Sequence, residues 1–463
     1  MQILERVLAI TAALMLLAAS SSNAAASATD AVERTLSNGM RLIVKPDHRA
    51  PVVVSMVWYR IGSVDEVNGT TGVAHLLEHM MFKGTKEVPA GEFSRIIAAA
   101  GGRENAFTGR DYTGYFQTLH KSQLGLALKL EADRMANLML SKEEFSKEVR
   151  VVMEERRWRT DDRPHALVYE RLMATALLAH PYRHPVIGWM SDIEHMRLED
   201  ARAFYRTWYA PNNAILVVVG DVAPAEVFTL AEQHFGALTS KTLPARKPQE
   251  EPPQLGIKRL TVKAPAELPY VLMAFRVPSL RDPHKDWEPY ALEVLANVLD
   301  GNDAARLPRT LVRTERLANS AGASYDGIGR GPALFYLDGV PSGATTVAQL
   351  EQALRREVRN VADNGVSEEE LKRIRAQVIA AHVYQRDSMF FQARQMGSME
   401  TAGLSYKTPD VILEKLKQVT AAQVQEVAKK YFGDDQVTIA YLDPQPLAER
   451  KPAAPPPGAR HGK

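Results

Sequence analysis

The sequence contains no cysteine in its 463 residues, which excludes disulfide cross-links and thiolate catalysis. Its 57 basic residues nearly balance its 55 acidic residues, and the formal net charge is only +2 at pH 7. A charge this small gives no reason to expect a nucleic acid or a membrane surface as a partner. Beyond the N-terminus, no apolar run approaches the roughly 20 residues of a transmembrane helix. With 45% hydrophobic and 24% charged residues, the chain has a globular composition and enough length for two domains or more.

Residues 1–28 have the pattern of a secretory signal peptide. Arg6 precedes the apolar stretch VLAITAALMLLAA, and small residues follow in SSSNAAASA. Cleavage after Ala24, Ala26 or Ala28 fits the A-x-A-like sites of this tract. An uncleaved membrane anchor is the alternative, and the small residues count against it. The sequence therefore predicts an exported protein, periplasmic in a bacterium, with no membrane attachment after signal removal.

Two proline-rich segments divide the rest of the chain. LPARKPQEEPPQ, residues 243–254, is predicted to be a stiff, solvated linker, and residues 446–463 are predicted to be a disordered tail. The blocks between them, 29–242 and 255–445, each begin with β-rich sequence, continue with helical stretches and close with a helix and a strand. This order predicts an α+β fold of two homologous domains, each a largely antiparallel sheet layered with helices.

The segment GVAHLLEHMMFKGT, residues 72–85, places titratable side chains in an otherwise apolar helix. His75 and His79 are four residues apart, so they project from one helix face about one turn apart, which suits two imidazoles on one zinc ion. Glu78 borders that face and can act as a general base on a water at the metal. This H-x-x-E-H order reverses the H-E-x-x-H helix of other zinc proteases. Satisfied core or surface histidines are the alternative interpretation.

Only the first block can carry this chemistry, because the corresponding helix of the second block, YALEVLANVLDGN, contains no histidine. A catalytic zinc usually takes a third protein ligand, and the acidic helix at 141–162 offers one. Glu148 and Glu155 are seven residues apart and project almost together, and Val151 and Val152 are expected between them on the same face. A carboxylate on an apolar face is costly unless it is paired or bound to metal. We therefore expect Glu155 to be the third ligand, with Glu148 supporting the site.

These residues resemble the pitrilysin-like zinc metallopeptidases, which include insulin-degrading enzyme and the mitochondrial processing peptidase. The motif His75-Leu-Leu-Glu78-His79 continues with MMFKGT, and Glu155 follows His79 by 76 residues, the distance typical of the family. The resemblance covers about 30 to 445, including the duplicated domain. It implies one zinc ion per chain, held by His75, His79 and Glu155, with Glu78 as the general base and Glu148 as a further acid at the site. The implied activity is endopeptidase cleavage of peptides or unfolded polypeptide segments.

The resemblance also implies where the substrate lies. The stretch GGRENAFTGRDYTGYFQ, residues 101–117, has a Gly-Gly turn followed by an alternating strand. In the family, the segment that begins here with Asn105 and Ala106 and continues through Phe107 and Thr108 is an edge strand beside the zinc. Such an edge pairs with the backbone of a peptide by β-augmentation. An ordinary strand protected by its neighbours is the alternative for residues 112–117.

The second block departs from the family pattern. Members active by themselves usually carry an Arg and a Tyr seven residues apart in a segment like LRxxxGLAY, and these two residues bind substrate. Here the segment is TLVRTERLANSAGASYDG, and an alignment without gaps places Val312 and Asn319 at those positions. Arg313 and Tyr325 are nearby at the wrong spacing. Half of the substrate clamp is therefore missing.

The missing clamp leads to a prediction about partners. In two-chain members of the family, one subunit holds the metal and a homologous partner supplies substrate contacts, so we expect a heterodimer whose partner provides the Arg/Tyr pair. A homodimer is the alternative.

There are two rival functions. One is a non-catalytic scaffold or assembly subunit of the same fold, and the other is a metal-storage or metal-sensing site. Neither explains the general base and the peptide-binding strand together.

Overall fold

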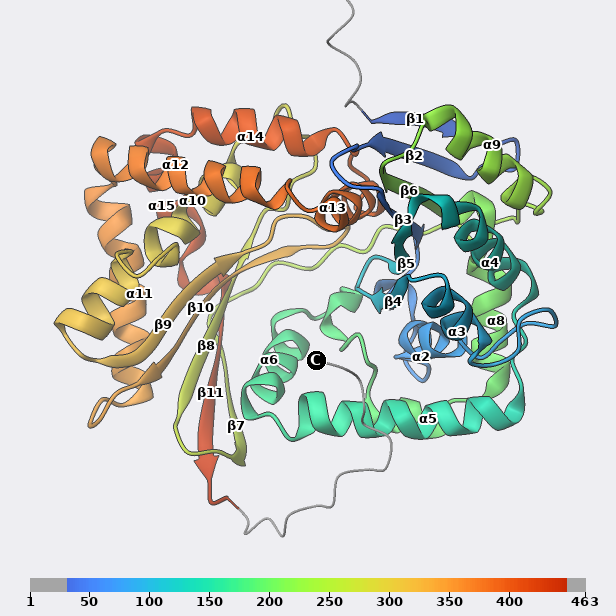
Figure 1. The fold of residues 1–463 in the computed structure, drawn as a ribbon. Coiled ribbons are helices and arrows are strands. Elements are labelled where there is room, and N and C mark those ends of the chain that lie inside the picture. The colour runs from blue at the N-terminus through green and yellow to red at the C-terminus, as the bar shows by residue number, and fades with distance from the viewer. Residues whose placement is uncertain (1–30, 448–463) are drawn as a thin grey trace, which may run out of the picture.

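The computed structural model describes residues 31–447, so the predicted signal peptide and the tail from residue 448 onward lie outside the described residues. The chain folds into two similar halves, each built on one twisted sheet (Figure 1). The α+β class, with two homologous domains and largely antiparallel sheets, is confirmed. Among residues 31–447, no helix has both the length and the apolar character needed to cross a membrane.

The first sheet has the strand order β1-β2-β6-β3-β5-β4. Its strands are β1 (Val32–Thr35), β2 (Arg41–Pro46), β3 (Val52–Tyr59), β4 (Arg103–Thr108), β5 (Thr113–His120) and β6 (Ala214–Gly220). β2 and β6 are parallel, and the other neighbours are antiparallel. The central strand β6 reads AILVVVG and is buried along its whole length, as expected for a strand covered on both faces.

The second sheet repeats this plan with the order β7-β11-β8-β10-β9. Its strands are β7 (Lys258–Pro265), β8 (Tyr270–Val277), β9 (Ala318–Tyr325), β10 (Ala333–Pro341) and β11 (Val437–Gln445). Here β7 and β11 form the parallel pair, as β2 and β6 do in the first sheet, and the remaining pairs are antiparallel. Strand order and pairing therefore match β2-β6-β3-β5-β4, which is the duplication that the sequence predicts.

Among the described residues, the first half has eight α-helices and the second half has six. In the first half they are α2 (Val73–Met80), α3 (Glu92–Ala99), α4 (Leu124–Asn137), α5 (Lys142–Arg156), α6 (Pro164–Ala176), α7 (Met190–His195), α8 (Leu198–Trp208) and α9 (Pro224–Phe235). In the second half they are α10 (Glu288–Asp300), α11 (Val347–Asn364), α12 (Glu368–Gln385), α13 (Met389–Thr401), α14 (Thr408–Gln418) and α15 (Ala421–Tyr431). Short 3-10 or π-helical turns lie at Ser63–Asp65, Lys121–Gln123, Arg157–Asp161, Pro181–Arg183, Pro211–Asn213, Pro308–Thr314 and Asp434–Gln436.

Each sheet is covered on one face by helices of its own half and on the other face by a helix from the opposite half (Figure 1). Helix α6 of the first half packs Leu172 and Met173 against Leu272 and Ala440 of the second sheet. Helix α13 of the second half covers the first sheet in the same way, over a cluster that includes Ile43, Met56, Trp58, Val217, Ala393 and Met396. Because apolar burial is the main stabilising term in folding, this exchange ties the two halves into one structure.

Glycine permits the close approach of α13. A Cβ atom at Gly397 would overlap the indole ring of Trp58, which is itself fully buried on the first sheet. Any larger residue at 397 would push the helix away from the sheet, and close-packed interiors do not absorb such a shift without cost.

Ion pairs and hydrogen bonds join the two halves around Asp65 and Asp111. Arg330 of the second half reaches Asp65 and, through Nε, lies 3.3 Å from Oδ1 of Asp111. The hydroxyl of Tyr182 donates to Asp111 at 2.6 Å and accepts the backbone N–H of Gly331 at 3.0 Å. The two carboxylates are almost enclosed, with side-chain exposures of 6% and 8%, so their partners matter more than those of surface pairs.

The segment 243–254 forms neither helix nor strand and is mostly exposed, but it is attached at several points. Arg246 pairs with Asp65 at 2.6 Å, and Glu251 accepts the backbone N–H groups of Ala179 and His180 at 2.9 and 2.8 Å. On the other side, Arg276 of the second half donates to the carbonyl oxygen of Pro252 at 2.6 Å. The connector is therefore held by both halves, which the composition of the segment does not reveal.

Candidate metal centre

The histidine-bearing helix α2 begins where the chain makes a turn that needs glycine. Gly72 has φ of +91°, and a Cβ there would clash with the carbonyl oxygen of Ile187. The carboxylate of Glu66 accepts the backbone N–H groups of Gly72 and Ala74, each at 2.8 Å. These are donors that the first turn of a helix leaves without intrahelical partners, so Glu66 fixes the start of α2.

Helices α2 and α5 bring the three predicted ligands together. Nε2 of His75 lies 3.7 Å, and Nε2 of His79 lies 3.3 Å, from Oε2 of Glu155. One ligand atom from each residue lies within 4.8 Å of the other two. Ligands held about 2.1 Å from a tetrahedral zinc ion stand roughly 3.4 Å apart, so this spacing fits zinc.

The polar atoms around this cluster also fit a cation. Oε2 of Glu155, which faces both histidines, is buried without a hydrogen-bond donor. His79 is oriented by Glu148, whose Oε2 lies 3.0 Å from the His79 Nδ1, so that Nε2 is directed toward His75 and Glu155. A carboxylate behind a ligating imidazole fixes its tautomer and raises its basicity. Lys83 in turn holds the other oxygen of Glu148 at 2.6 Å.

The two histidines have opposite pKa shifts. Burial, reinforced by the neighbouring His79, lowers the pKa of His75 to about 4, which keeps its ring neutral and able to bind a cation. Burial also opposes charge on His79, but its hydrogen bond to Glu148 and its close contact with the Glu155 carboxylate outweigh burial and raise its pKa to about 9. The same contacts overcome burial and lower the pKa of both carboxyl groups. The cluster is thus an electrostatically coupled unit.

Glu78 lies on the same helix, directed toward the edge strand β4. Its carboxylate accepts a hydrogen bond from the hydroxyl of Thr108. Both residues line the cavity beside the cluster. Burial raises the pKa of Glu78, although the bond from Thr108 and the nearby His79 act in the other direction. A carboxylate in such surroundings is suited to accept and release a proton.

The buried face of α5 differs in one respect from the sequence prediction. Val152 is fully buried, whereas Val151 is 47% exposed and does not share the packed face. Successive helical residues are rotated by about 100°, and the buried residues Phe145, Val152 and Arg156 centre the packed face on one side of Glu148. Glu155 therefore lies at the margin of that face, where it borders the cavity.

The predicted substrate strand is an edge in the structure. In the described part of the chain, no strand pairs with the outer side of β4. Residues Asn105, Ala106, Phe107 and Thr108 all border the cavity beside the metal cluster, which has a volume of about 770 Å³. Ala106 faces the first-half core, and Phe107 packs against Trp58 on the opposite face of the sheet. The backbone N–H of Ala106 is covered by the side chain of its neighbour Asn105 at 2.8 Å.

Several contacts at the site were not predicted from the sequence. Glu66 reaches α2 from an irregular segment, and Thr108 reaches Glu78 although the resemblance implies only contact with substrate. Arg159, one turn beyond Glu155, pairs with the second oxygen of its carboxylate at 2.8 Å. The four-residue spacing of Glu155 and Arg159 is the one local signal that could have indicated such a pair.

Comparisons with known proteins show the family. A family model described as Insulinase (Peptidase family M16) matches residues 41–188, and one described as Peptidase M16 inactive domain matches residues 195–378. The zinc protease PqqE of Helicobacter pylori is 33% identical over 424 residues, which cover 89% of this chain and 92% of that protein. The chain belongs to peptidase family M16. The model described as inactive matches mostly the second half, whose helix α10 has no histidine.

Other family members and solved structures give the same result. The uncharacterized zinc protease YmxG of Bacillus subtilis is 26% identical and covers 89% of this chain and 97% of its own length. The crystal structure of a protease from Helicobacter pylori superposes with a TM-score of 0.85 at 31% identity, covering 90% of this chain and all of that one. The periplasmic protease PqqL of Escherichia coli shares the fold, with a TM-score of 0.78 at 19% identity, and this chain spans 49% of it.

Proposed function

We propose that this chain is a zinc endopeptidase, exported to the periplasm, that cleaves peptides or unfolded polypeptide segments. The observation that carries the proposal is the convergence of His75, His79 and Glu155 within 4.8 Å, with Glu78 beside them on α2. These three residues would hold one zinc ion, and the zinc-protease names of the relatives support that metal. The signal-peptide pattern supports export, and PqqL, a protein of the same fold, is periplasmic.

The residues of this chain have distinct roles in such a reaction. Zinc bound here would act as a Lewis acid and lower the pKa of a water. Glu78 takes a proton from the attacking water and returns it to the leaving amine. Thr108 holds that carboxylate through its hydroxyl, and the free edge of β4 aligns the peptide backbone beside it.

Glu78→Gln tests the proposal. The substitution keeps the shape of the side chain and removes its basicity, and general-base groups contribute about 10²–10⁴-fold to rate. We expect peptide cleavage to fall by about 1,000-fold while each chain still binds one zinc ion, measured by metal analysis and by hydrolysis of a quenched fluorescent peptide. Cleavage at the wild-type rate would show that the mechanism is wrong. A wild-type chain without stoichiometric zinc would instead favour the scaffold alternative.

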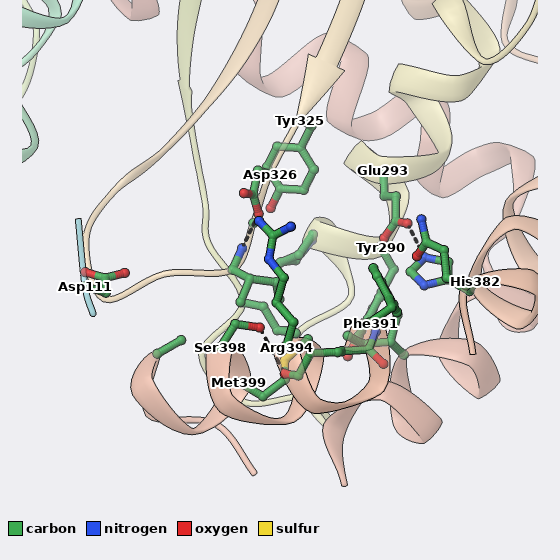
Figure 2. Close-up of a pocket in the computed structure, with 18 of the residues that line it drawn as sticks. Asp111, Tyr290, Glu293, Tyr325, Asp326, His382, Phe391, Arg394, Ser398 and Met399 are labelled. Atoms are coloured by element: carbon green, nitrogen blue, oxygen red, sulfur yellow. Dashed lines mark hydrogen bonds and ion pairs between the residues drawn. The ribbon is translucent and has the colours of Figure 1, made fainter. Parts of the chain in front are cut away.

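We also infer that the chain is the catalytic subunit of a two-chain enzyme. Asn319 lies on β9 and donates to the carbonyl oxygen of Pro341, and Val312 packs against the second-half core, so neither supplies a substrate clamp. The nearby candidates are engaged elsewhere. Arg313 donates to the carbonyl oxygen of Asp303, and the hydroxyl of Tyr325 donates to that of Pro278 at 2.7 Å. Figure 2 shows Tyr325 in the wall of another cavity, of about 400 Å³, which is lined mostly by the second half and also by Asp111 and Tyr112 of the first.

A homologous subunit with an intact Arg/Tyr pair should restore the missing contacts. Misplaced substrate can cost about 100-fold in rate, so we expect low activity for the isolated chain and a rise of this order on addition of the partner. Copurification from native extract identifies the partner, and a peptide-cleavage assay with and without it measures the effect. Full activity of the purified chain, unchanged by any such subunit, would contradict the heterodimer and leave the homodimer.

A further inference from the structure

The cavity beside the metal cluster continues behind the tip of the β4–β5 hairpin. Arg110, Tyr169 and Met173 border both the 770 Å³ cavity and a smaller one of about 260 Å³ that reaches the second sheet at Tyr336. Arg110 lies in the hairpin turn, where the backbone N–H of Gly109 donates to the carbonyl oxygen of Tyr112 at 2.8 Å. A peptide paired with the edge of β4 would therefore extend directly past Arg110.

Arg110 and Arg183 border this cavity, and within residues 31–447 neither has an acidic partner; Arg183 instead donates to the carbonyl oxygen of Leu178 at 2.7 Å. The guanidinium of Arg110 donates through Nη2 to the hydroxyl of Tyr169 at 2.8 Å, its charge lies 5.1 Å from the ring centroid of Tyr182, and its Nε is buried without an acceptor. A half-buried guanidinium held only by aromatic groups has strong unused capacity to bind an anion.

The nearby acids already have partners. Asp111 accepts the hydroxyl of Tyr182 and pairs with Arg330, and Glu170 accepts two hydrogen bonds from Arg156, at 2.8 and 3.0 Å. Asp326 also borders the smaller cavity, and its Oδ1 accepts the backbone N–H of Ile328 at 3.0 Å. The positive charge of Arg110 is consequently not neutralised by the protein around it.

We propose that Arg110 and Tyr169 form a subsite that binds a carboxylate of the peptide substrate. The guanidinium would donate hydrogen bonds to the carboxylate oxygens, which accept them, and the Tyr169 hydroxyl holds the guanidinium in place. This inference rests on the proposed peptidase function and adds a substrate preference to it. The carboxylate has two sources. A peptide antiparallel to β4 would present an acidic side chain near Arg110, and a parallel peptide would present its C-terminus.

Binding to the zinc-loaded Glu78→Gln chain tests the subsite without requiring catalysis. The probes are fluorescent peptides that share one sequence and differ in two features: Glu or Gln within the sequence, and a free or amidated C-terminus. Charge-assisted hydrogen bonds to a carboxylate predict about tenfold tighter binding of the carboxylate-bearing peptide. If replacing Glu by Gln abolishes this preference, the carboxylate is that of an acidic side chain. If amidation abolishes it, the carboxylate is that of the peptide C-terminus.

Substitution assigns the preference to Arg110. In the same background, Arg110→Gln should remove the preference, Arg110→Lys should keep part of it because the charge remains without the guanidinium, and Tyr169→Phe should reduce it. Arg163→Gln removes an equal charge outside the cavity, next to Trp158, and should leave the preference unchanged. Thermal unfolding of each variant separates loss of binding from loss of folding.

The outcomes distinguish the subsite from the proposed function. An equal preference in the Glu78→Gln chain with and without Arg110→Gln, or no binding of acidic peptides, overturns the subsite. An Arg110-dependent preference in a chain that never cleaves peptides supports the subsite and refutes the peptidase proposal.

Discussion

The two halves share a scaffold and differ in what their equivalent helix pairs carry. In the first half, α2 and α5 bring two imidazoles and two carboxylates together around His79. The corresponding helices of the second half are α10 and α12, and there the contact is a single pair, His382 with Glu293, at 2.8 Å. Most other residues of α10 are apolar and pack in the second-half core.

This difference shows how little of the fold the cluster of potential metal ligands occupies. Strand order, the parallel strand pair and the exchanged helices α6 and α13 are common to both halves, so they serve stability rather than chemistry. A zinc centre needs three convergent ligands and a base, and one imidazole–carboxylate pair cannot provide them. The second half is therefore free to use the same positions for packing.

The difference between the two halves is tested most severely by His79→Ala. Because His79 would be a ligand and is also the contact of Glu148, its loss should remove the zinc ion and lower activity by at least ~1,000-fold, given the several kcal/mol that a metal contributes to transition-state stabilisation. Zinc analysis and the peptide assay measure both effects. His195→Ala, which removes an exposed imidazole near the end of α7, serves as the control. Retention of one zinc per chain in His79→Ala would show that the metal binds elsewhere.

The exchanged helices predict that the halves unfold together. Leu172 of α6 is fully buried against the second sheet, so Leu172→Ala should lower the free energy of unfolding by about 3 kcal/mol. Although α6 belongs to the first half, we expect one transition that shifts as a whole in denaturant, followed by circular dichroism and by tryptophan fluorescence.

Arg171→Ala, on the exposed side of the same helix, should change the unfolding free energy by less than about 0.5 kcal/mol. Two separate transitions, with Leu172→Ala moving one of them, would contradict the interdependence of the halves.

The sequence predicts best what depends on local spacing. His75, Glu78 and His79 belong to one helix, so the 3.6-residue period alone places them together. Glu155 lies on a different helix, and its assignment needed both the seven-residue repeat with Glu148 and the family resemblance. The same repeat misplaced Val151, because a helical period gives relative directions of side chains but not where the buried face is centred.

Long-range contacts could not be predicted in this way. No pattern in α6 indicates that its apolar face packs on the second sheet rather than the first, because both sheets offer equivalent apolar surfaces. Arg110 and Tyr169 meet across 59 residues, and Arg330 reaches Asp65 across 265. Such pairs are fixed by the packing of whole elements, which a single sequence does not encode locally.

The smallest effect should come from the second-half pair, through His382→Ala. The side chains of His382 and Glu293 are 23% and 28% exposed, and partly exposed ion pairs contribute about 0–1 kcal/mol to stability. We therefore expect a fall of less than about 1 kcal/mol in the free energy of unfolding, measured in denaturant, and no change in zinc content or in cleavage of the peptide. Glu293→Gln provides the matched substitution on the other helix. If the pair acts only locally, the double variant should lose no more free energy of unfolding than the two single variants together. A loss of zinc in His382→Ala would mean that the equivalent helix pairs are coupled across the molecule, and the second half would then contribute to the metal centre as well as to the scaffold.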